Sequence, residues 1–474
     1  MRRITAFIFL GLFSAVLLAG CGGSYNAPVM NPGPGAQAAQ VSVSLTDAPP
    51  VGVTVFTFEV TVTGATLNPG GIDVLAGKSP QRIEVKKLET ENAFLSTANI
   101  AAGNYTSLNL TFSNPELTFR NDTGAMLAGC APGTVCEIKP SGTLSATVNG
   151  LFYSTSGSQT GILVDLNLAN LITPSLDVDF STASAVTATQ QTKDGQGNLE
   201  DLDDLNGLVA TPSSSQFTLQ TVDMGNITIA MDSNTQFDGF NTCTAANATC
   251  IQSGQSVEVD LMLLASGTFL AKKVELQDDA QGAADDELDG VISKIDGPAQ
   301  FELVVIDELR SVANVSVGDP VTIMLTTTGG GTSFQVDTNG LNVPATLQQG
   351  FEGATDTSQL LPGQTVQVRK RAMTGGPAPA AITITTDRVR LRDTRLTATV
   401  SGAPSGSSFN VGGLPSLFTS AGISQFQVQT SSQTNFDNVA GVSGLANGST
   451  VSLRGLLFKS TTNPVLIADK VRMR

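Results

Sequence analysis

The chain has 474 residues and a formal net charge of −16, with 41 acidic side chains, 25 basic side chains and no histidine. This charge disfavours nucleic-acid binding, because contact with phosphates needs a basic surface. The lack of histidine excludes Ser-His-Asp and Cys-His nucleophile systems and histidine metal ligands. No tryptophan and only three tyrosines are present, so an aromatic platform for stacking on sugars is poorly supplied.

The first twenty residues predict an export signal. Two arginines precede a mostly apolar run over residues 4–19, which then ends in Leu-Ala-Gly-Cys at 18–21. A run of this length, with a positive flank and a small-residue exit, is typical of a secretory signal peptide and too short to span a membrane. The ending resembles the lipobox of bacterial lipoproteins. That resemblance implies cleavage before Cys21 and a lipid on its sulfur; an ordinary signal peptide with a chance cysteine is the alternative.

The residues after the signal predict a tethered envelope protein. Residues 21–40 are rich in Gly, Pro, Ala and Asn, which suits a flexible tether. No later segment is apolar for long enough to cross a bilayer, so the lipid would be the membrane anchor. Among lipoproteins of this kind, an Asp after the lipid cysteine retains the protein in the inner membrane. Gly22 therefore favours the outer membrane.

Four further cysteines form two local pairs, Cys130 with Cys136 and Cys243 with Cys250. An oxidising compartment would make each pair a disulfide, in keeping with export. A four-cysteine zinc site is the alternative. Neither spacing is the usual Cys-x2-Cys of zinc sites, so we favour disulfides.

Residues 41–188 are expected to form a first domain. Period-two patterns with β-branched residues recur between turns, for example over 55–67 and 105–112. The opening strand ends in Leu-Thr-Asp-Ala-Pro at 45–49, and a later strand begins at Gly103-Asn-Tyr105. These marks resemble a domain-of-unknown-function family common in bacterial lipoproteins. The resemblance implies a prealbumin-like β-sandwich and no activity. Short helices are expected only at 86–98 and within 345–361.

Residues 189–204 break the strand pattern and are expected to form an acidic linker. Oxygen-bearing side chains recur in its Gly-rich sequence, including Asp194, Asn198, Glu200 and Asp201. Calcium prefers six to eight such oxygens in a flexible loop, so a calcium site is one hypothesis. The series lacks the regular acidic positions of an EF-hand loop, and a solvated linker is the alternative.

Three units follow the linker, over residues 205–279 (unit 1), 280–393 (unit 2) and 394–474 (unit 3). They share five landmarks in the same order, which indicates an internal repeat. The landmarks are an opening Leu (Leu205, Leu288, Leu396), an aromatic (Phe217, Phe301, Phe409), Thr-x-Phe (Thr235, Thr332, Thr434), Gly-x-x-Val (Gly254, Gly363, Gly448) and a closing basic-Val pair (Lys273, Arg388, Lys470). Unit 2 departs from the others through an insertion at about 338–360.

The landmark order predicts about five strands in each unit, which best fits a small OB-like barrel. The units resemble a second domain-of-unknown-function family of exported proteins, marked by Gly-x-Val, Thr-x-Phe and Gly-x-x-Val-x-Val. The aromatic residues of the Thr-x-Phe motifs are most simply core residues. The whole chain is thus expected to be all-β, with one sandwich and three barrels.

No constellation of catalytic residues is apparent, so we expect no enzyme. The main hypothesis is a lipid-anchored structural or interaction protein of the cell envelope, which presents its β domains to another envelope protein or a polysaccharide. The alternative is a module that binds a small molecule or glycan. A glycan hydrolase would need two converging carboxylates, which the sequence does not reveal. A deep pocket with convergent polar groups would favour the ligand-binding alternative.

Overall fold

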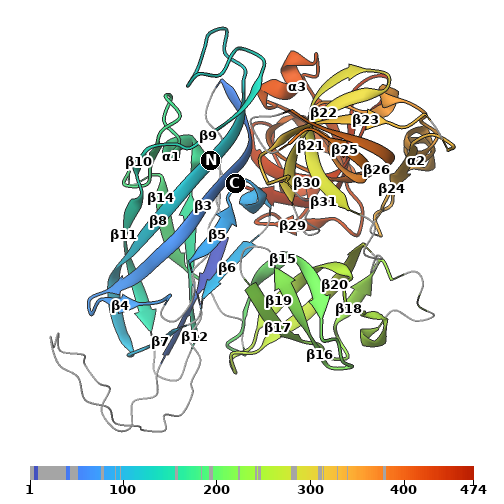
Figure 1. Ribbon diagram of the computed structural model, residues 1–474. Helices are drawn as coiled ribbons and strands as arrows, with labels where there is room; N and C mark the ends of the chain where they lie inside the picture. Colours follow the sequence, from blue (N-terminus) through green and yellow to red (C-terminus); the bar gives the residue numbers. More distant parts are fainter. Residues whose placement is uncertain are drawn as a thin grey trace.

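A computed structural model shows a mostly β protein in three regions (Figure 1). The first domain has long strands and lies beside units 2 and 3, while unit 1 lies below these two in the view. The structure describes residues 5–8, 39–42 and 52–474, except for 76–79, 91, 97, 155–158, 183, 192–195, 222–224, 241–242, 244–246, 279–285, 308–311, 313, 328, 339 and 377–380. Among the helices of these described residues, none is long and apolar enough to span a membrane.

Two six-stranded sheets build the first domain. One has the order β6-β1-β12-β2-β7, with β14 paired to β12, and the other has the order β11-β8-β3-β4, with β5 and β9 on β3 and β8. The bounds are Thr5–Ile8 (β1), Ala39–Ser42 (β2), Val53–Asn68 (β3), Ile72–Asp73 (β4), Gln81–Glu84 (β5), Asn92–Ser96 (β6), Ala98–Ile100 (β7), Gly103–Asn121 (β8), Val135–Ile138 (β9), Ser145–Ser154 (β11), Gln159–Leu166 (β12) and Val186–Gln190 (β14). A short parallel pair, Gly142–Thr143 (β10) and Val178–Asp179 (β13), and the single-turn helix Leu168–Leu171 (α1) complete it.

Side chains from both sheets share one hydrophobic core, for example Val62 of β3, Phe112 of β8 and Val164 of β12. The first half of β3 departs from simple alternation, because every residue from Val53 to Val60 is buried. A strand is buried on both faces only when something covers its outer face. Here that cover comes from units 2 and 3, since Phe56 packs in a small apolar cluster with Val304 and Leu417.

The strands of each later unit pair around a closed circuit. In unit 1 the circuit runs through β15, β16, β17, β20 and β19, because β17 also pairs with β20. In unit 2 it runs through β21, β22, β23, β26 and β25, with β23 also paired to β26. In unit 3, β26 pairs with β27 and β30, and β28 and β31 complete the path between them.

The strands of unit 1 are Leu199–Ala210 (β15), Gln216–Thr221 (β16), Gly225–Ala230 (β17), Gln236–Asp238 (β18), Ser256–Leu263 (β19) and Phe269–Asp278 (β20). Those of unit 2 are Glu287–Gly297 (β21), Gln300–Asp307 (β22), Pro320–Leu325 (β23), Ser333–Val336 (β24), Thr365–Thr374 (β25) and Ile382–Ser405 (β26), with the helix Ala345–Glu352 (α2). Unit 3 adds Ser408–Gly412 (β27), Ser416–Ser420 (α3), Phe426–Gln429 (β28), Asn435–Asp437 (β29), Thr450–Phe458 (β30) and Val465–Met473 (β31). Four single turns of 3-10 helix are Lys87–Glu89 (η1), Ala248–Cys250 (η2), Thr357–Gln359 (η3) and Val442–Gly444 (η4).

The Thr-x-Phe motif has the same structure in all three units. Its short strand runs parallel to the last strand of the circuit, as β18 on β20, β24 on β26 and β29 on β31. The threonine hydroxyl donates to a main-chain oxygen of that strand, over 2.8 Å from Thr235 to Ala271, 2.9 Å from Thr332 to Thr386 and 2.7 Å from Thr434 to Ala468. Each hydroxyl also accepts from a preceding main-chain NH. The threonine therefore fastens a loop to the end of the circuit.

The Gly-x-x-Val motif requires a glycine because the backbone at this position is left-handed. Gly254, Gly363 and Gly448 have φ angles of 86°, 87° and 87°, in the left-handed region that side-chain-bearing residues rarely adopt. In each unit this glycine donates its NH to the opening strand, to Val209, Ile292 and Val400 respectively. The turn thereby sets the register between the first strand and the Val strand that follows.

The structure corrects several expected boundaries. Units 2 and 3 do not separate at 393/394, because one strand of 24 residues, β26, serves both circuits. The expected linker 189–204 is shorter, since β14 ends at Gln190 and β15 begins at Leu199. Residues 86–98 form one turn, η1, and then the strand β6 rather than a helix. The expectation for 345–361 is confirmed by α2 and η3.

Within the expected signal peptide, Thr5–Ile8 forms β1, which pairs with β6 and β12. The cleavage expected before Cys21 would remove this strand from the first domain.

Candidate functional site

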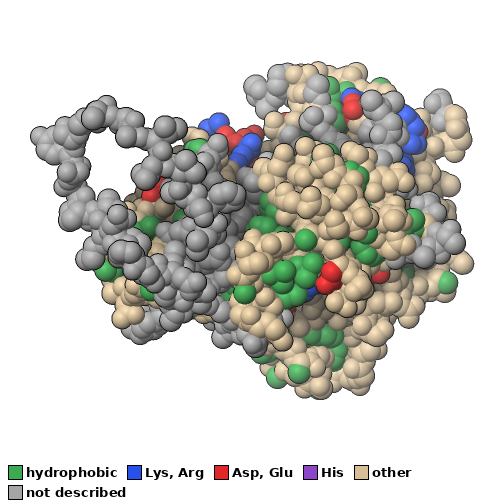
Figure 2. Space-filling model, turned by 90° about the horizontal axis from the view of Figure 1, so that it is seen from below, with side chains coloured by type: hydrophobic (Ala, Val, Ile, Leu, Met, Phe, Trp, Pro, Cys, Tyr) green, Lys and Arg blue, Asp and Glu red, His purple; other side chains and the backbone are tan. Residues whose placement is uncertain are grey.

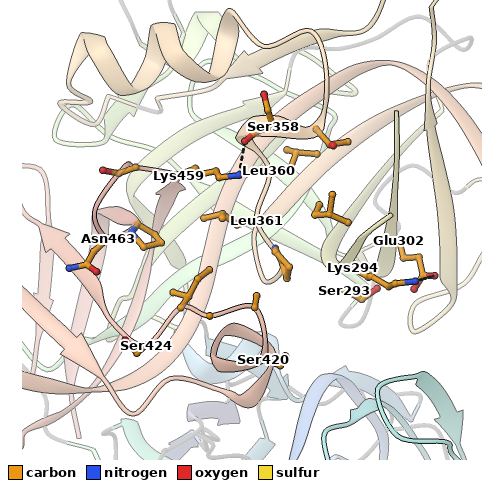
Figure 3. Close-up of a pocket in the computed structure, with 18 of the residues that line it drawn as sticks. Ser293, Lys294, Glu302, Ser358, Leu360, Leu361, Ser420, Ser424, Lys459 and Asn463 are labelled. Carbon is orange, nitrogen blue, oxygen red and sulfur yellow. Dashed lines mark hydrogen bonds and ion pairs between the residues drawn. The ribbon is translucent and has the colours of Figure 1, made fainter. Parts of the chain in front are cut away.

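A cleft of about 720 Å³ opens where units 2 and 3 meet the tip of the first domain. Its walls come from β21 and β22, from the segment around η3, from the residues after α3 and from the connection between β30 and β31 (Figure 3). The first domain contributes Arg120, Gly133 and Val135. We call this space the junction cleft. Figure 3 shows its polar side chains on several sides of Leu361.

Ser293 lines the junction cleft from a β-bulge. Ile292 pairs with Leu303 and Lys294 with Glu302, so Ser293 is an extra residue in β21 without a partner position in β22. Bulges of this kind re-aim side chains and are common beside functional sites. Ser293 is 3% exposed, and its Oγ has no hydrogen-bond partner among the described residues. A buried hydroxyl without a partner costs about 1–3 kcal/mol, so a partner supplied beside this residue would be favoured.

Two lysines hold positive charge in the cleft. Lys459 Nζ donates to the main-chain oxygen of Ser358 over 2.8 Å (Figure 3). This hydrogen bond links the β30–β31 connection to η3. Lys294 forms an ion pair with Asp296 and lies 3.8 Å from Glu302. Burial, followed by the nearby Asp296 carboxylate, raises the pKa of Glu302 above its ordinary value.

The rest of the lining is rich in hydroxyls and amides. Ser358, Ser420, Ser424, Ser460, Thr357, Thr462, Gln425 and Asn463 all line it. Among the described lining residues the charged groups are Arg120, Lys294, Lys459 and Glu302, which makes three cations against one carboxylate, and none is aromatic. Cations therefore outnumber carboxylates in the described lining, while Arg120 and Lys294 form ion pairs with Asp122 and Asp296 just outside it. Its chemistry suits hydrogen bonding to a polyhydroxylated, weakly anionic ligand.

Both predicted disulfides are confirmed. Cys130 is bonded to Cys136 and Cys243 to Cys250, and the pairs are 6 and 7 residues apart in sequence. Disulfides persist in oxidising compartments, so they indicate an extracytoplasmic location. Neither pair lines the junction cleft.

The residues of the calcium hypothesis lie only partly within the described chain. Asp194 and the lipidation residue Cys21 lie outside it. Glu200 and Asp201 belong to the strand β15 rather than to a loop, and Asn198 Oδ1 accepts from the main-chain NH of Ala265 over 3.0 Å. Among the described residues, no group of three or more Asp, Glu, Cys or His side chains is arranged to hold a metal ion.

Sequence reasoning did not find the junction cleft, although one signal pointed to it. The insertion of unit 2, at about 338–360, leads into Thr357, Ser358 and Leu360, which form one wall. In repeat proteins, an insertion found in a single unit often forms a loop on the binding face. The other walls come from loops whose convergence depends on how the first domain packs against units 2 and 3.

The family comparisons match two parts of the chain. No curated protein matches it. Residues 206–275, which cover most of unit 1, match a domain of unknown function (DUF5666). Residues 38–200, which cover the first domain, match a domain of unknown function (DUF4382), so the chain joins segments similar to these two families in that order.

Proposed function

We propose that the protein is an exported, lipid-anchored binding protein of the cell envelope, and that its junction cleft holds an acidic saccharide. The observation that supports this best is Ser293, which lines the polar cleft and whose buried hydroxyl has no hydrogen-bond partner among the described residues. A buried polar group of this kind is normally paired with protein or ordered water. A saccharide hydroxyl would supply the missing partner, while Lys294, Lys459 and Arg120 would attract its carboxylate.

The surface supports a polar ligand over an apolar protein partner. Among the described residues, Met126 is the only large hydrophobic side chain that is exposed. Figure 2 shows one face of the molecule, on which hydrophobic side chains lie in separate groups among uncharged atoms. Interfaces between proteins normally bury an apolar centre. The alternative function, presentation of the β domains to an envelope protein, would have to use a polar surface.

The lipid on Cys21 and the tether over 21–40 are part of this proposal. They would hold the binding domains close to the membrane, most simply the outer membrane. The disulfides and the negative charge are consistent with export. We further propose that the first domain is a prealbumin-like sandwich and that the three units are OB-like barrels of common origin. The two sheets around one core, the closed strand circuits and the repeated threonine contacts support this.

Saccharide binding can be tested with trigalacturonate as an acidic probe and maltotriose as a neutral one. Isothermal titration or saturation-transfer NMR on the full-length protein should show binding of trigalacturonate and weaker binding of maltotriose. Added salt should weaken the first more, because exposed charges are screened. The substitution Ser293→Val should weaken trigalacturonate binding about three- to tenfold, since one hydrogen bond is lost.

The stability of Ser293→Val distinguishes a ligand contact from a structural role. Ser293→Val replaces the unpaired hydroxyl by a methyl group and adds a second methyl group at a residue that lines the cleft, so the unfolding temperature should stay unchanged or rise. Lys459→Gln should also weaken trigalacturonate binding, whereas the exposed, distant Ser215→Ala should not. The proposal would be contradicted if the unaltered protein bound trigalacturonate no more tightly than maltotriose. It would also be contradicted if Ser293→Val and Lys459→Gln bound trigalacturonate as tightly as the unaltered protein.

A further inference from the structure

A second cavity, of about 360 Å³, lies between the start of β3, η1, the loop before α3 and the first strands of units 2 and 3. We call it the apolar cavity. Its walls include Val53, Val55, Phe56, Leu414 and Phe418, all less than one tenth exposed. An occupant with apolar atoms would gain packing contacts with these walls and remove them from water. The lining therefore suits an apolar occupant.

One side of the apolar cavity is cationic. Lys86 and Lys87 of the η1 segment and Arg395 of β26 line it, and all three are half-buried. Arg395 Nε donates to Thr90 Oγ1 over 3.2 Å, which holds the guanidinium at this side. Lys86 forms an ion pair with Glu89, which does not line the cavity.

Among the described lining residues Glu84 is the one carboxylate, and its oxygens accept hydrogen bonds from the main chain. The Glu84 carboxylate accepts hydrogen bonds from the main-chain NH groups of Phe58 (2.8 Å), Lys86 (3.0 Å) and Lys87 (2.7 Å). Burial raises the pKa of Glu84 to about 7, so its negative charge at neutral pH is only partial. Lys87 interacts electrostatically with Glu84, and Arg395 with Asp393, which does not line the cavity. In the described lining, cations therefore outnumber carboxylates three to one, and Lys87 and Arg395 are in position to contact an anion.

We propose that the apolar cavity binds a single-chain fatty acid, with its hydrocarbon chain along the valine, leucine and phenylalanine walls and its carboxylate beside Lys87 and Arg395. The two halves of the lining match the two halves of such a molecule. Apolar burial supplies the affinity, and the charge-assisted contacts fix which end of the ligand lies against η1. This site is separate from the junction cleft and does not depend on saccharide binding.

Photo-crosslinking tests this on the full-length protein. The probe is a decanoate that carries a diazirine at the end of its chain, and the adducts are located by peptide mass spectrometry. We expect adducts within residues 52–56 and 414–418. Unlabelled fatty acids should compete in the order decanoate, octanoate, hexanoate, with about fourfold weaker competition for each methylene removed. The neutral alcohol 1-decanol should compete more weakly than decanoate.

Matched variants distinguish the contribution of the two cations from that of the apolar walls. Lys87→Gln combined with Arg395→Gln should reduce labelling about tenfold or more and abolish the advantage of decanoate over 1-decanol. Leu414→Trp, which fills the cavity, should prevent competition by either compound. Lys459→Gln, in the junction cleft, should leave labelling unchanged. Adducts spread over the surface, competition that ignores chain length, or labelling that the Lys87/Arg395 variant retains would each overturn the proposal.

Discussion

Thr118 of the first domain donates its hydroxyl hydrogen to the main-chain oxygen of Gly318 in unit 2, over 3.1 Å and in a buried position. Gly318 has a φ of 91°, and a Cβ atom added to it would lie 2.6 Å from Thr118 Oγ1. The close approach therefore depends on the glycine. This contact joins the first domain to unit 2. A second contact, from Leu417 NH to Thr54 Oγ1 over 3.1 Å, joins the first domain to unit 3 in the wall of the apolar cavity.

The Thr118–Gly318 contact predicts coupled substitutions. Gly318→Ala should destabilise the protein by about 1–3 kcal/mol, because it adds backbone strain and a clash with the hydroxyl. Thr118→Ala removes the clashing atom, so the double substitution should cost less than the sum of the single ones by more than about 0.5 kcal/mol. Denaturant unfolding of the four proteins measures this. Additive losses would show that the two residues do not interact.

The Thr-x-Phe contacts predict losses of stability in all three units. Thr235→Val and Thr434→Val each remove the hydroxyl that a buried main-chain oxygen and a part-buried NH contact, so each should reduce the free energy of unfolding by about 1–3 kcal/mol. Thr332→Val should cost less, because Thr326 NH also donates to the main-chain oxygen of Thr386 over 2.9 Å. Thr228→Val, on an exposed position of β17, serves as the control and should change stability by less than about 0.5 kcal/mol. A loss confined to one unit would argue against structural equivalence of the three.

The junction of units 1 and 3 depends on Arg454, which is 3% exposed. Its Nη2 lies 2.9 Å from Glu258 Oε1 of unit 1, and its Nε donates to Asp469 Oδ2 over 2.7 Å. Arg454→Met would leave both carboxylates without their cation, so we expect a loss of about 3–5 kcal/mol. Lys139→Met, which removes a 77% exposed lysine from its pair with Glu116, should leave the unfolding midpoint nearly unchanged. Similar losses for both would contradict this assignment.

Glu84 predicts a specific pH dependence. Its pKa is raised by burial from 4.5 to about 7, so between these values the folded chain binds more protons than the unfolded chain. The contribution of Glu84 to the free energy of unfolding should therefore fall as the pH rises from about 4.5 to 7, by up to about 3 kcal/mol. Glu84→Gln has no titrating group at this position, so the stability of the unaltered protein relative to this variant should fall by the same amount between pH 4.5 and 7. Parallel curves for Glu84→Gln and the unaltered protein would contradict the raised pKa.

Local patterns were sufficient to predict the strands, the disulfides and the landmark positions. Period-two alternation reports which face of a strand is buried, and short cysteine spacing brings two sulfurs together without knowledge of the fold. The glycine at 254, 363 and 448 likewise follows from a local turn. The prediction of a helix over 86–98 was wrong because it used local spacing alone. In the fold, part of this segment forms β6, which pairs with the distant strand β1.

The arrangement of the domains was beyond the reach of these patterns. A strand shared by two units, β26, looks in sequence like two strands separated by a boundary. Ser293 looks like an ordinary polar strand residue, because only the pairing of β21 with β22 shows that it is bulged. Both cavities are built from segments hundreds of residues apart, such as Val135 and Asn463 in the junction cleft.

The location of saccharide binding is the most direct test of the function proposed here. Asn463→Cys places a thiol in the lining of the junction cleft, and Ser215→Cys places one at an exposed position of unit 1. Their rates of reaction with a maleimide should be measured with and without trigalacturonate. At four times the dissociation constant, the saccharide should slow the reaction at position 463 about fivefold and leave that at position 215 unchanged. Equal rates at position 463 with and without bound saccharide would contradict a binding site in the cleft.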